Sequence, residues 1–132
     1  MMLVDRKNNL LIIKRRSVIT GRIKFGGKVV VGLGSIILGD IEAEQVSISK
    51  NCSVRCIKCQ KVVVGAFSNF GEIEAEDVKI LSNCKGERIK GNLIKISKGC
   101  RFEEVYGDII LIEGETKIRK LEGRKIIALP KT

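Results

Sequence analysis

The 132-residue sequence contains no tryptophan and no histidine, only one tyrosine and only one proline. Without histidine, neither a Ser-His or Cys-His catalytic pair nor a histidine-ligated zinc centre can be built. No GxxxxGK[ST] motif is present, so a P-loop nucleotide site has no support. We therefore predict that the chain is not an enzyme and that it uses no catalytic residue, no metal and no cofactor.

Long apolar runs and a secretory leader are also missing. No run approaches the ~20 residues of a membrane-spanning helix. No signal peptide is evident, and the five cysteines are an odd number, which argues against a framework of disulfides. These features predict a protein of the reducing cytoplasm.

The sequence does contain a strict repeat of sixteen residues. Apolar residues recur at an anchor position and again five, seven and thirteen residues after it. A small residue follows the anchor by two, and a cysteine, serine or threonine follows it by eleven, two before the thirteenth position. Apolar positions two apart are typical of a strand with one buried face. A fixed period with three such pairs predicts an all-β, single-domain parallel β-helix, or solenoid, of about seven coils of ~16 residues with three short strands each. The anchors are Ile41, Ile57, Ile73, Ile89, Val105 and Leu121.

Charges at two outward positions of the repeat alternate in sign from coil to coil. If successive coils stack in register, each charge lies between two opposite ones, which stabilises neighbouring strands. A helical interpretation gives no reason for this alternation. The two rows are Glu42, Lys58, Glu74 and Lys90, and Glu72, Arg88, Glu104 and Lys120.

The repeat divides the chain into three parts. Residues 17–130 form the predicted β-helix, with one inserted residue near Gly26 and Gly27, and residues 131–132 form a short end. Residues 1–16 do not fit the repeat and are a basic, apolar tail or a capping strand. Two interpretations of an apolar run with cations behind it stay open: contact with an anionic membrane surface, or an added strand over the first coil. That segment is Leu10, Leu11, Ile12, Ile13, Lys14, Arg15 and Arg16.

The two ends of the solenoid should be apolar. No helical segment that could cap either end is visible, and an open β-helix exposes unpaired backbone and core edges there. An uncapped end can be satisfied by the end of another copy. We predict an interface formed by Ile19, Ile23, Phe25, Val29 and Val31 at one end and by Leu121, Ile126, Ala128 and Leu129 at the other.

Two outward surfaces are further candidates for binding. Lys85, Arg101 and Lys117 form a like-charged row, which could bind an anion. Nucleic acid is disfavoured because aromatic residues are missing among the basic ones. An apolar patch near the C-terminal end could bind a partner. It consists of Leu93, Ile109, Leu111 and Ile127.

The cysteines also follow the repeat. Cys52, Cys84 and Cys100 share an inward position, so we expect packed thiols rather than a metal site, although Cys56 and Cys59 have a CxxC spacing. Cys56 points outward and should be the most reactive.

Four segments resemble the bactofilin family of polymer-forming cytoskeletal proteins. They are ITGRI at 19–23, ILGDIEAEQVSI at 37–48, FGEIEAEDVKI at 70–80 and VYGDIILI at 105–112. The resemblance covers about residues 17–130. It implies a right-handed β-helix that polymerises with itself, end to end and without nucleotide, often at the inner face of the membrane through the N-terminal tail.

The sequence and this resemblance together predict a cytoskeletal scaffold whose main partner is itself. Two alternatives stay open. One is a non-polymeric solenoid that binds anionic partners, either nucleic acid or lipid. The other is a degenerate acyltransferase of the left-handed hexapeptide type, although a coil of sixteen residues does not divide into hexapeptides and the catalytic histidine is absent.

Overall fold

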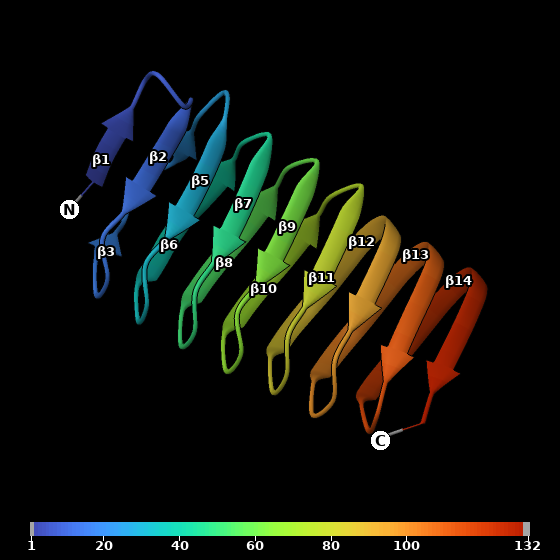
Figure 1. Cartoon of the computed structure of the whole chain (residues 1–132). Helices are drawn as coiled ribbons and strands as arrows, with labels where there is room; N and C mark the ends of the chain where they lie inside the picture. Colours follow the sequence, from blue (N-terminus) through green and yellow to red (C-terminus); the bar gives the residue numbers. More distant parts are fainter. Residues whose placement is uncertain (1, 131–132) are drawn as a thin grey trace.

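The computed structural model describes residues 2–130, and every regular element among them is a β-strand. The strands stack as one long column, with the two termini at its opposite ends (Figure 1). Their bounds are β1 (Met2–Asp5), β2 (Leu10–Ile13), β3 (Val18–Ile19), β4 (Ile23–Lys24), β5 (Lys28–Val31), β6 (Ile36–Glu42), β7 (Gln45–Ile48), β8 (Ser53–Lys58), β9 (Lys61–Val64), β10 (Asn69–Glu74), β11 (Asp77–Ile80), β12 (Lys85–Ile96), β13 (Arg101–Glu113) and β14 (Lys117–Leu129).

The column is a right-handed parallel β-helix of about eight turns, which confirms the predicted fold class with about one coil more than expected. Equivalent strands of successive coils pair in parallel, and from β8 onward the register advances by the predicted sixteen residues. Ile73, for example, lies opposite Ile57 on one side and Ile89 on the other. The anchors therefore form a continuous ladder inside the column.

The predicted short strands are partly joined to one another. One strand of each central coil, such as β8 or β10, joins the residue thirteen after one anchor to the next anchor, and in the last three coils the strand continues through 12 or 13 residues. The joined strands keep their backbone pairing with the next coil on more than one face, because β12 and β13 pair at ten positions between Lys85 and Ile96.

The interior from Leu11 to Ile110 is apolar except for three buried serines. Each inward side chain is covered by its equivalents in the coils before and after it, which stabilises the fold by about 1.5–3 kcal/mol per large side chain. One rung differs: Gly86 lies between Phe70 and Phe102, whose ring centroids are 5.5 Å apart. The missing side chain of Gly86 makes room for these two rings.

The β-helix begins earlier than the predicted residue 17. β2 pairs in parallel with β5, and its residues Leu11 and Ile13 are buried in the core. β1, which precedes β2 in the chain, pairs antiparallel with its outer edge. The repeat did not reveal this coil because the first coils are longer: the offset between paired residues is eighteen at Ile23 and seventeen at Lys28. This change agrees with the insertion predicted near Gly26 and Gly27.

Candidate functional site

The C-terminal end exposes an apolar rim. β14 pairs with β13 along one edge, and no other strand of the described residues pairs with its second edge. Ile126 is 43% exposed and Leu129 is 47% exposed, whereas Ile110, the neighbour of Ile126 in the same ladder, is fully buried. Leu121 is half-buried and Ala128 is exposed. The structure therefore brings the four predicted C-terminal interface residues together on one rim.

The prediction for the N-terminal rim is wrong for three residues, which are buried. Val29 and Val31 are fully buried, because β2 covers β5 on that face. Ile23 is also buried, and Ile19 and Phe25 are half-buried at the edge of the core. Beyond the predicted residues, three apolar residues of β1 are exposed at this end, and the sequence repeat gave no indication of them. They are Met2, Leu3 and Val4.

The apolar run at residues 10–13 is a strand of the first coil. Leu11 and Ile13 point into the core, and Leu10 and Ile12 are half-buried. The capping-strand interpretation is thus confirmed for this run, and its two inward side chains cannot contact a membrane in the folded protein. The basic residues 14–16 follow it in an exposed turn. Within residues 2–130, no helix has the length and apolarity needed to cross a bilayer.

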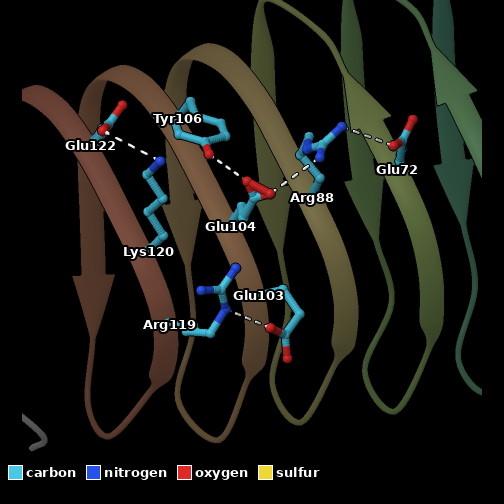
Figure 2. Close-up of polar contacts among 8 residues, drawn as sticks. All are labelled: Glu72, Arg88, Glu103, Glu104, Tyr106, Arg119, Lys120 and Glu122. Atoms are coloured by element: carbon cyan, nitrogen blue, oxygen red, sulfur yellow. Dashed lines mark hydrogen bonds and ion pairs between the residues drawn. The ribbon is translucent and has the colours of Figure 1, made fainter.

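The alternating charges on the outer face lie opposite one another across coils as predicted, and three of the six neighbouring pairs in the two rows form ion pairs. Arg88 donates hydrogen bonds to Glu72 and to Glu104, both at 3.1 Å, from the coils on either side (Figure 2). Lys58 and Glu74 form an ion pair at 3.5 Å in the neighbouring row. Exposed pairs of this kind stabilise a fold only slightly. Their main effect is to fix the register, since a slip of one coil would place like charges together.

Tyr106 extends this polar network. Its hydroxyl donates a hydrogen bond to Glu104, and the amine of Lys120 lies 5.8 Å from the centre of its ring (Figure 2). The bond to Glu104 raises the pKa of Tyr106 above its ordinary value, with smaller contributions from burial and from the negative charge of Glu104.

Replacing Glu104 by glutamine is expected to lower the pKa of Tyr106 toward its ordinary value, because the hydrogen bond to a carboxylate that favours the neutral phenol is lost and a neutral amide no longer repels the phenolate. Tyr106 is the only tyrosine, so the ultraviolet absorbance of tyrosinate against pH reports it directly. Glu103→Gln is the matched control, since Glu103 pairs with Arg119 instead. Equal titration curves for both variants and the parent protein would contradict the assigned bond.

The predicted basic row is in register. Lys85, Arg101 and Lys117 lie opposite one another on β12, β13 and β14, and all three are exposed. Among the described residues, no carboxylate lies within 4.0 Å of any of them. Three stacked cations without counter-charges favour the binding of an anion. The row ends at the C-terminal rim.

The predicted apolar patch is contiguous but only partly exposed. Leu93 lies opposite Ile109, and Leu111 lies opposite Ile127; all four side chains are half-buried. More exposed apolar residues lie near the other end, where Val18 and Ile36 are direct neighbours on β3 and β6. Outward positions of the repeat could have identified them. This second group is Val18, Leu33, Ile36 and Leu38.

The inward cysteines are packed thiols, as predicted, and no disulfide occurs within the described residues. The thiols of Cys52, Cys84 and Cys100 each donate a hydrogen bond, at 3.2 Å, to a carbonyl oxygen of the preceding coil. Ser17, Ser35 and Ser68 occupy the same ladder and are also buried.

The two cysteines with CxxC spacing differ in their surroundings. Burial raises the pKa of Cys59 to about 12. Cys56 is half-buried on the charged face, where burial first and the carboxylates of Asp40 and Glu72 next raise its pKa. Both thiols are therefore mostly protonated near neutral pH, which lowers the reactivity expected of Cys56.

A left-handed backbone precedes the ladder of serines and cysteines. Asn51, Phe67 and Asn83 have φ values of 56°, 60° and 59°. Asparagine adopts this conformation readily, but a bulky side chain rarely does. Arg16, with a φ of 58°, and Phe67 are the two bulky residues that adopt it before this ladder, and Phe67 is 57% exposed at the corner. The sequence repeat did not predict these conformations.

Within the described part of the chain, no three or more Cys, Asp or Glu side chains are grouped so that they could hold a metal ion. Comparisons with protein-family models, with curated proteins and with solved structures found no match for this chain.

Proposed function

We propose that this chain is a bactofilin-like structural scaffold that assembles end to end with copies of itself and needs no nucleotide. The observation that carries the proposal is the C-terminal rim, where the core ladder ends without a cover. Ile126 is 43% exposed at a position whose equivalents in earlier coils, Ile94 and Ile110, are fully buried. The apolar surface that an added coil would bury is therefore left in contact with water.

The backbone of the last coil supports the same proposal. β14 runs for 13 residues around the column, and among the described residues only β13 pairs with it. A long edge strand can hydrogen-bond to a strand of another chain. Burial of apolar surface would stabilise the end-to-end contact by about 25 cal/mol per Å², in addition to those hydrogen bonds.

The resemblance to bactofilins maps onto equivalent places in the fold. The segments ILGDIEAEQVSI and FGEIEAEDVKI cover β6 to β7 and β10 to β11, which are the same parts of two coils. A location at the inner face of a membrane would be served by β1 rather than by residues 10–13. Met2, Leu3 and Val4 are exposed there, close to the basic residues Arg6 and Lys7.

Replacing Ile126 by lysine tests the scaffold. We expect the variant to fold as a monomer and to form no filaments, because each end contact would bury a charge against apolar side chains. The end-to-end dissociation constant should rise by about 100-fold or more, since roughly 3 kcal/mol is a modest cost for an unpaired buried charge. Sedimentation velocity measures the association, and negative-stain electron microscopy shows the filaments.

Leu38→Lys is the matched control. Leu38 is also an exposed apolar residue, at 53%, but it lies on the outer side of β6 and away from the C-terminal rim. This variant should assemble like the parent protein. Unchanged filaments of Ile126→Lys would rule out the rim as the contact surface.

A second candidate function is a non-polymeric module that binds anionic partners, and the row of Lys85, Arg101 and Lys117 favours it. Two measurements distinguish the two functions. A module of this kind stays monomeric at high protein concentration, and its binding to anionic lipid vesicles weakens as salt is added.

A further inference from the structure

The positive charge of the protein is concentrated at its two ends. Residues 1–24 contain seven Lys or Arg and one Asp, and residues 117–132 contain six Lys or Arg and one Glu. The 92 residues between them, 25–116, contain twelve Lys or Arg and thirteen Asp or Glu. In the fold, β1 to β4 and β14 are the opposite ends of the column (Figure 1). The molecule is therefore a nearly neutral column with a strongly basic coil at each end.

The cations of the last coil are largely without partners. Arg119 is paired with Glu103 at 2.8 Å, and Lys120 lies 4.0 Å from Glu122. Lys117, Arg124 and Lys125 are exposed, and the described residues place no carboxylate within 4.0 Å of them. These three cations surround the same rim that exposes Ile126 and Leu129.

The first coils have the same character. Lys14, Arg15 and Arg16 are exposed in the turn between β2 and β3, next to the edge where the column begins. Arg22 is paired with Glu42 at 2.8 Å, but the three turn cations have no carboxylate within 4.0 Å among the described residues. Whichever ends meet, a basic coil faces a basic coil.

Two opposing forces therefore act on any end-to-end contact. The apolar rims attract, but stacked coils are about 4.8 Å apart, and this is shorter than the screening length of about 8 Å at physiological ionic strength. Like charges at that distance repel each other. An anion with several charges that lies between the two coils removes the repulsion and gives hydrogen-bond acceptors to cations of both copies.

We propose that the two basic rims bind multivalent phosphate-type anions and that end-to-end association of this chain is coupled to the uptake of these anions. This inference rests on the proposed scaffold function. The ligand class follows from the chemistry of the rims: Lys and Arg donors bind phosphate oxygens well. The unpaired row from Lys85 through Arg101 to Lys117 extends the binding surface away from the rim. Inorganic oligophosphate fits better than nucleic acid, because stacking partners for bases are lacking.

The test uses the full chain and tripolyphosphate as the probe. Sedimentation velocity is run at about 20 mM and about 300 mM NaCl, where the screening lengths are roughly 20 Å and 6 Å. We expect the dissociation constant for association to fall by about tenfold at the higher salt, the reverse of a contact held by ion pairs. Submillimolar tripolyphosphate should produce at least the same change when ionic strength is held constant with NaCl.

Two triple variants locate the effect. Lys117→Gln combined with Arg124→Gln and Lys125→Gln should associate at low salt without an anion and lose the response to tripolyphosphate. The control is Lys61→Gln combined with Lys79→Gln and Lys95→Gln, which removes the same charge from exposed positions in the body of the column. The control should respond like the parent protein. Circular dichroism verifies that both variants are folded.

The possible outcomes separate this inference from the scaffold itself. Association that weakens as NaCl is added, or equal responses of the two triple variants, would overturn the inference and leave the scaffold standing. NaCl as effective as tripolyphosphate at equal ionic strength would overturn anion binding, because screening alone would then suffice. A chain that never associates contradicts the scaffold and the coupling. Calorimetric binding of tripolyphosphate to that monomer, lost in the rim variant, would still support the anion site.

Discussion

Replacing Gly86 by isoleucine is expected to lower the free energy of unfolding by about 3 kcal/mol, the upper part of the range for overpacked cores. A Cβ atom at Gly86 would lie 2.2 Å from Cε1 of Phe70, far inside van der Waals contact. Phe70 cannot move aside freely, because it is buried and its ring packs on Phe102 at 5.5 Å. Chemical denaturation followed by circular dichroism measures the change.

A second substitution tests the cause. In the variant that combines Gly86→Ile with Phe70→Val, the ladder regains a normal sequence of side chains, since Val54 already occupies the rung before Phe70. We expect this variant to recover most of the lost stability, with a coupling free energy of about 1–3 kcal/mol. Gly26→Ile is the control, because nothing lies within 4 Å of a Cβ atom built there. If both glycine variants lose equal stability, the clash is not the cause.

Deleting one whole coil should be tolerated, whereas deleting one residue fewer should not. Removal of residues 93–108 joins Asn92 to Ile109, and Ile109 already lies opposite Leu93, so every later residue keeps its inward or outward direction. Removal of residues 93–107 turns each later ladder residue to the wrong face. Each large apolar residue turned outward forgoes about 1.5–3 kcal/mol. The shorter deletion should therefore unfold all coils after the junction.

Thermal unfolding followed by circular dichroism distinguishes the two deletions. The sixteen-residue deletion should retain one cooperative transition, with a lower midpoint because a coil is missing. The fifteen-residue deletion should lose the β-sheet signal of the C-terminal coils before any heating. The pairing of β12, β13 and β14 contains no register shift that could accommodate a missing residue, whereas β6 has such a shift between Ile37 and Asp40. Similar transitions for both proteins would show that register is not fixed by the ladders.

The central coils could be predicted well from the sequence because each of them repeats the same inward apolar positions and the same outward charged positions. The pairing of Ile57, Ile73 and Ile89 could be predicted from a spacing of sixteen, and the bonds from Arg88 to Glu72 and Glu104 from alternation of charge. In-register stacking is the arrangement that satisfies both patterns. The exposed C-terminal rim could be predicted from the same repeat, because the apolar positions continue into the last coil and no later coil covers them.

The N-terminal end could not be predicted in the same way. Offsets of eighteen and seventeen residues hid the equivalence of Leu11 with Val29, so that β2 was left outside the solenoid and two buried valines were assigned to the rim. The reversal of β1 depends on the turn between it and β2, where Asn9 has a φ of 51°. The repeat predicts only the features that all coils have in common. The N-terminal cap departs from the repeat, so the repeat contains no information about it.

Contact between coils passes only from one coil to the next, since each strand pairs with its equivalents immediately before and after it. A substitution that destabilises one coil should therefore affect its two neighbouring coils and have little effect further along the column. The column has no single hydrophobic centre, so its stability is a sum of contributions from each coil and from each junction between neighbouring coils. Unfolding should begin at the junction with the weakest contacts.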